Sequence, residues 1–142
     1  MSLYLDTSCL LKLVLVEPES ARVRQLLQAE PQVIISTLAE LEAEQYLWSH
    51  LLGGGLRRRE HAQLSELLAG LRGGAPFVHK TPPHDLAQIS RRQILSSRAY
   101  CRTLDRLHLA AMEALGVSRL LTNDDQQAAA ARALGFGVVL PR

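Results

Sequence analysis

Short apolar segments that alternate with helical segments are the feature that most restricts the fold of this chain. The segments are rich in leucine and β-branched side chains, as in buried strands. They cover residues 3–5, 33–35, 120–122 and 138–140, with 77–79 as a further candidate. Strands separated by helices form parallel sheets that are covered by helices on both faces. The sequence therefore predicts an α/β fold around a central parallel sheet.

The helical segments have recognisable ends. Helices are predicted over residues 9–16, 20–29, 37–52, 58–72, 84–98 and 104–115, with a last helix that ends at 134. We expect Thr103 to cap the helix 104–115, and Asn123 or Asp124 to cap the last helix. The glycine run 53–55 follows a helix rather than a strand, so it is not interpreted as a phosphate-binding loop.

Length and composition indicate a globular chain. With 142 residues it can bury its own core, and we expect a single domain over residues 1–142. No apolar stretch approaches the roughly 20 residues that span a bilayer, and no basic region followed by an apolar signal segment opens the sequence. We therefore expect a cytoplasmic location without membrane contact, and we expect Cys9 and Cys101 to be reduced core residues.

Arginines are concentrated in two parts of the chain. One group comprises residues 57–59, and the other comprises Arg91, Arg92, Arg98, Arg102 and Arg106. A net charge of +2 alone is a weak indicator of nucleic-acid binding. Each group therefore has two interpretations, a solvated helix face or a surface that contacts phosphates.

Four acidic residues lie near predicted helix N-termini: Asp6, Glu40, Asp105 and Asp124. Acids favour this position because free amide groups and the helix dipole attract them, by roughly 0.3–1 kcal/mol each. Thr37 and Glu40 also match a capping box, and Asp124 matches an N-cap. Each acid, taken singly, is thus explained as a helix cap.

Their common position supports a second interpretation. Strand ends in a parallel sheet share one edge, so acids that follow them converge on one crevice, where ligands of such folds bind. Crowded carboxylates stay partly protonated unless a cation offsets them. Mg²⁺ or Mn²⁺ is the expected cation, because both prefer oxygen ligands and retain water. Such an ion activates water and offsets charge that develops on a phosphate, while nearby arginines hold flanking phosphates.

Four stretches in this order resemble PIN-domain proteins of the VapC toxin type: "YLDTSCLLKL", "STLAELEAE", "RTLDRLHLAAMEALGVSRLLTND" and "LGFGVVL". Residues 53–98 match that family only in helical character. The resemblance implies a three-layer α/β/α sandwich and a metal-dependent endoribonuclease that cleaves RNA. It also implies an antitoxin protein that blocks the site, and formation of a homodimer.

The resemblance also implies roles for individual residues. The family's four acids, which are catalytic and hold Mg²⁺ or Mn²⁺, match Asp6, Glu40, Asp105 and Asp124. Supporting polar positions match Ser8 and Thr122.

Other side chains near these positions are less specific. Glu44 lies one turn beyond Glu40 and is a further supporting candidate, whereas Glu42 is expected to point elsewhere into solvent. Asp124 is preferred to its neighbour Asp125. His108 is interpreted as a neutral or hydrogen-bonded core residue, and Trp48 and Met112 as core. Arg102 and Arg106 are candidates for binding the substrate.

Two other functions are compatible with part of the pattern. A phosphatase of the haloacid-dehalogenase type places a second aspartate two residues after the first, where this chain has Ser8. A catalytically weak PIN-like module that binds RNA or protein is the other alternative.

Overall fold

The computed structural model describes residues 1–142 and contains one five-stranded sheet in which all paired strands are parallel. The strand order is β3-β2-β1-β4-β5. The strands are β1 (Ser2–Leu5), β2 (Gln32–Ser36), β3 (Phe77–Lys80), β4 (Arg119–Leu121) and β5 (Gly137–Val139). The carboxyl ends of β2, β1 and β4 therefore lie side by side at one edge, as the sequence predicted.

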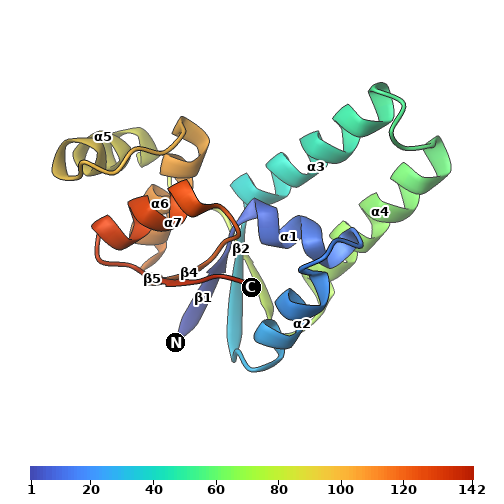
Figure 1. Ribbon diagram of the computed structural model, residues 1–142, viewed down its shortest axis with the longest axis horizontal. Helices are drawn as coiled ribbons and strands as arrows, with labels where there is room; N and C mark the ends of the chain where they lie inside the picture. Colours follow the sequence, from blue (N-terminus) through green and yellow to red (C-terminus); the bar gives the residue numbers. More distant parts are fainter.

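Helices cover both faces of the sheet, so the fold is the expected three-layer α/β/α sandwich (Figure 1). One layer contains α1 (Thr7–Val14), α2 (Ser20–Gln28), α3 (Thr37–Leu52) and α4 (Arg58–Gly70), which a 3₁₀ turn, η1 (Leu71–Gly73), follows. The other layer contains α5 (Leu86–Ser96), α6 (Thr103–Leu115) and α7 (Asp125–Ala133). In Figure 1, α3 and α4 form a hairpin that projects beyond the sheet.

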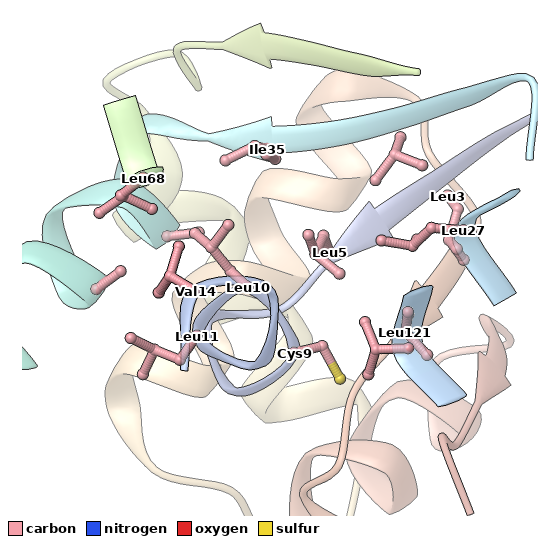
Figure 2. Close-up of a cluster of buried hydrophobic side chains, with 14 of the residues drawn as sticks. Leu3, Leu5, Cys9, Leu10, Leu11, Val14, Leu27, Ile35, Leu68 and Leu121 are labelled. Atoms are coloured by element: carbon pink, nitrogen blue, oxygen red, sulfur yellow. The ribbon is translucent and has the colours of Figure 1, made fainter. Parts of the chain in front are cut away.

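Strand β1 supplies side chains to both cores. Leu3 and Leu5 belong to the core beneath α1–α4, whereas Tyr4 belongs to the core beneath α6 and α7. This alternation follows from the two-residue period of a strand. Figure 2 shows Leu10 and Val14 of α1 among the residues of the first core. The central strand is thus fixed from both sides.

Several local expectations are confirmed. Asp124 is the N-cap of α7, and its side chain accepts a hydrogen bond from the Gln127 amide. Both cysteines are buried and unpaired. Met112 is fully buried.

Three local expectations are wrong. The N-cap of α6 is Arg102 rather than Thr103. Ser36 rather than Thr37 caps α3 and accepts the Ala39 amide proton, so Thr37 and Glu40 form no capping box. Trp48 is 48% exposed rather than in the core, and its ring meets that of His61 of α4 edge-on. None of the helices combines the length and the apolar composition that crossing a bilayer requires.

Two leucines of α3 test the orientation of this helix. Leu47 is 1% exposed and packs in the first core, whereas Leu41 on the same helix is 62% exposed. We expect Leu47→Ala to lower the free energy of unfolding by about 2–5 kcal/mol, because it removes buried methyl groups and leaves a cavity. Leu41→Ala is the matched control and should change it by less than about 0.5 kcal/mol. Urea denaturation measures both values, and equal losses would contradict the described packing.

Candidate active site

Asp6 is held at the sheet edge by the pairing of β1 with β4. Its backbone amide donates to the carbonyl of Leu121, the last residue of β4, at 3.0 Å. Asp6 has an extended backbone and is also the N-cap of α1. The capping role and a role in binding therefore do not exclude each other.

The two carboxylate oxygens of Asp6 have different surroundings. Oδ2 accepts hydrogen bonds from the Ser8 hydroxyl at 2.8 Å, from the Ser8 amide at 3.2 Å and from the Thr122 hydroxyl at 3.2 Å. No protein group donates a hydrogen bond to Oδ1, and His108 Nε2 lies 3.9 Å from it. Ser8 and Thr122 thus fix the orientation of the carboxylate and leave one oxygen available for a ligand.

Asp105 and Asp124 converge on one cation, Arg102. Arg102 Nε donates to Asp105 Oδ2 at 3.1 Å, and Nη2 lies 3.5 Å from Asp124 Oδ2. Burial raises the pKa of Asp105, Arg102 opposes this change, and the negative charges of Asp6 and Asp124 add to it. These three aspartates therefore form one electrostatic group, as the sequence predicted.

The structure does not bring Glu40 into this group. Its carboxylate accepts two hydrogen bonds from Arg72 of η1, at 2.7 and 3.0 Å, and lies 3.6 Å from His79 of β3. Glu44, one turn later on α3, lines the same pocket as Glu40 and Arg72. Both glutamates therefore face the α4 side of the molecule rather than the three aspartates.

Glu42 takes the place expected for Glu40, and the prediction that it points into solvent is wrong. It accepts a hydrogen bond from the Thr7 hydroxyl at 3.0 Å and pairs with His108 Nε2. Residues two positions apart on a helix point in nearly opposite directions, so Glu40 and Glu42 cannot face the same crevice. The inward stripe Ala39, Ala43 and Leu47 runs between them.

His108 is fully buried among polar groups. Its Nδ1 lies 2.7 Å from the Tyr4 hydroxyl, which lies 2.7 Å from the Ser36 hydroxyl. Burial lowers the pKa of His108, but the hydrogen bond to Glu42 and the charges of Asp6, Glu42 and Asp105 outweigh it, and the pKa is raised. The prediction of a hydrogen-bonded core histidine is thus confirmed.

The two candidate arginines occupy different environments. The side chain of Arg102 is 70% exposed and lies over the acidic group. Arg106 is only 4% exposed and donates to the Ala99 carbonyl, so it does not lie on the open surface beside the acids. Asp125 is exposed and pairs with Arg142, which separates it from Asp124.

The acidic side chains do not form a preassembled metal site. No three His, Cys, Asp or Glu side chains are placed so that they could hold an ion together as they stand. Arg102 instead offsets the charges of Asp105 and Asp124. The acidic group nevertheless offers carboxylate oxygens only, and Asp6 Oδ1 and Asp105 Oδ1 accept no hydrogen bond from the protein. This chemistry fits Mg²⁺ or Mn²⁺.

An α/β/α sandwich with aspartates gathered at the carboxyl edge of its parallel sheet defines the class of protein. The family model described as PIN domain matches residues 3–133. The chain therefore belongs to the PIN-domain family. It is similar to ribonuclease VapC46 of Mycobacterium tuberculosis, with 31% identity over 99% of this chain and 98% of the relative.

Solved structures share the fold. The crystal structure of VapC20 of M. tuberculosis, described as a sarcin-ricin loop cleaving toxin, matches with a TM-score of 0.70 and 18% identity over 94% of this chain and 95% of that one. The FitAcB structure of Neisseria gonorrhoeae matches with a TM-score of 0.72 and 17% identity over 98% and 97% of the two chains. VapBC2 of Rickettsia felis, bound to a promoter DNA fragment, matches with a TM-score of 0.69 and 14% identity over 99% and 98%.

The pair of His108 and Glu42 predicts a pH dependence. The folded pKa of His108 is above its unfolded value of about 6.5, so its contribution to stability is complete below that pH and is lost as pH rises through the folded pKa. We expect Glu42→Gln to lower this pKa, because the hydrogen-bonded negative partner is removed. NMR titration of the His108 ring measures the change. Glu44→Gln is the control, and an equal effect of both substitutions would contradict the described pairing.

Proposed function

We propose that this chain is a metal-dependent endoribonuclease and the toxin of a toxin–antitoxin pair, built as a single PIN domain over residues 1–142. The observation that carries the proposal is the convergence of Asp6, Asp105 and Asp124 at one edge of the sheet. The similarity to a ribonuclease over nearly the whole chain supports it. RNA is the proposed substrate.

Asp6, Asp105 and Asp124 would hold Mg²⁺ or Mn²⁺, and Asp6 Oδ1 and Asp105 Oδ1 are the oxygens that have no protein donor. A bound ion of this kind supplies an activated water and offsets the charge that develops on the phosphate. Ser8 and Thr122 keep Asp6 oriented through Oδ2. We assign the fourth acidic position to Glu42 rather than Glu40, because Glu42 reaches the aspartates through His108.

Arg102 has two roles in this proposal. Without RNA or metal it offsets the charges of Asp105 and Asp124. With an ion held by these aspartates, the exposed guanidinium would be free to contact a phosphate of the substrate. In this proposal the metal ion replaces the Arg102 guanidinium as the positive charge beside Asp105 and Asp124.

A protein antitoxin and a homodimer complete the proposal. The similarity to VapBC2 of R. felis and to FitAcB supports an antitoxin partner. A pocket between α3 and α4 is lined by the ion pair of Glu40 and Arg72 and by the exposed Trp48. This pocket combines apolar and charged side chains, and it is the surface that we assign to the antitoxin. The alternative of a weakly catalytic binding module is supported by the occupation of two acids by Arg102.

The decisive substitution is Asp6→Asn. We expect RNA cleavage in Mn²⁺ or Mg²⁺ to fall by about a hundredfold or more, because the free oxygen loses its charge while the hydrogen bonds of the other can persist. EDTA should abolish the wild-type activity. Cleavage of labelled RNA measures both effects, and the exposed Asp85→Asn is the control. Activity that survives both EDTA and Asp6→Asn would contradict the proposal, and binding of RNA without cleavage would favour the alternative.

The exchange at Arg102 predicts opposite changes in two affinities. In Arg102→Gln, Mn²⁺ should bind roughly fivefold more tightly or better, because a positive charge 3.1 Å from Asp105 Oδ2 and 3.5 Å from Asp124 Oδ2 is removed. RNA should bind more weakly, because a phosphate contact is lost. Calorimetry with Mn²⁺ and fluorescence anisotropy with RNA, the latter on the Asp6→Asn chain, measure the two changes. Unchanged affinity for both would contradict the role given to Arg102.

A further inference from the structure

A second pocket lies where α5, the segment 97–102 and the start of α6 meet. Its volume is about 370 Å³. The polar side chains that line it include Ser90, Ser97, Arg98, Tyr100, Thr103 and Arg106, and no acidic residue lines it. The pocket therefore presents hydrogen-bond donors and two positive charges without a counter-ion.

Arg106 is the buried part of this pocket. It is 4% exposed, and its Nη2 donates to the Ala99 carbonyl at 3.1 Å. Its Nη1 is buried and has no hydrogen-bond partner. No carboxylate lies within 4.0 Å of the guanidinium, in contrast to the ion pairs of Arg72, Arg102 and Arg119. A buried guanidinium without a counter-charge and with one unpaired nitrogen is unfavourable, and an anion bound in the pocket would supply both the charge and the acceptor.

Other donors surround the same space. Ser90 is buried, and its hydroxyl has no partner. The Ser97 hydroxyl accepts the Ala99 amide proton, so its own proton is available. Thr103 is the first residue of α6, a 13-residue helix whose N-cap makes no side-chain hydrogen bond to the first turn. Free amides at such a helix start favour a negative charge.

We propose that this pocket binds a phosphate group. Arg106 and Arg98 supply the positive charge, and Ser90, Ser97 and Thr103 supply neutral donors. A tetrahedral phosphate, whose oxygens point in several directions, matches donors that surround a space better than a planar carboxylate does. The phosphate can come from an RNA backbone or from free phosphate, and both sources share this chemistry.

The position of the pocket favours RNA. Asp105 and Arg106 are consecutive on α6, with Asp105 in the acidic group and Arg106 in the pocket. One strand can therefore place one phosphate at the acids and a neighbouring phosphate in the pocket, with the exposed Tyr100 ring beside it as a surface for base stacking. This choice of RNA rests on the proposed nuclease function, whereas the phosphate site does not.

The first arm of the test uses inorganic phosphate and the full chain without metal. We expect amide chemical shifts to change in a saturable way within residues 97–106. Arg106→Gln should remove the response, and Arg98→Ala, an exposed position that leaves the core intact, should weaken binding about tenfold, the effect of one charge-assisted hydrogen bond. Arg59→Ala on α4 is the matched control and should change nothing. Absence of a saturable response in a chain that is folded by the same spectrum would overturn the site.

The second arm uses a short RNA, the Asp6→Asn chain and EDTA. We expect Arg98→Ala to weaken RNA binding about tenfold, and inorganic phosphate to compete with RNA. If phosphate binds but RNA affinity does not depend on Arg98, the assignment to RNA is overturned and the site takes free phosphate. If the wild-type chain cuts no RNA but the phosphate response persists, the proposed nuclease function fails while the phosphate site stands.

Discussion

The pairing of β1 with β4 is the constraint on which the candidate site depends. It joins Asp6 to Leu121 through a backbone hydrogen bond, and it brings Thr122, which follows β4, within 3.2 Å of the Asp6 carboxylate. A shift of the pairing by one residue would turn Tyr4 and Leu5 to the wrong cores and separate these groups. The two cores that hold β1 in register therefore also hold the site in register.

The second constraint is the placement of charged side chains, three of which lie on helix α6 and point in different directions. Asp105 turns toward the acidic group, Arg106 toward the pocket without acids, and His108 toward the buried Tyr4 and Glu42. These directions differ because each residue of a helix is rotated by about 100° from the one before it. Cations offset part of the acidic charge, so the fold tolerates carboxylates that would otherwise repel one another. Carboxylate oxygens without a donor at the acids, and a guanidinium without a counter-charge in the pocket, are the observations that indicate ligands.

The sequence by itself determined the elements and the edge at which the acids lie. Short apolar segments predicted every strand, including 77–79, because a buried strand needs only a few β-branched or large apolar residues. The alternation of strands and helices predicted the parallel sheet, and the position of Asp6 and Asp124 within a few residues of strand ends predicted their meeting at its carboxyl edge. These are local patterns that do not depend on strand order.

Only the tertiary structure decided which flank of each helix faces the acids. Glu40 and Glu42 border the same inward stripe of α3 on opposite sides, and the periodicity of the helix is identical for both. The choice follows from the strand order, which places β3 with His79 beside one flank, whereas Thr7 and His108 lie beside the other. The burial of Arg106 was decided in the same way, because the packing of α5 on α6 closes around it. Helical spacing fixes the angles between side chains, but contacts between distant segments fix what each side chain meets.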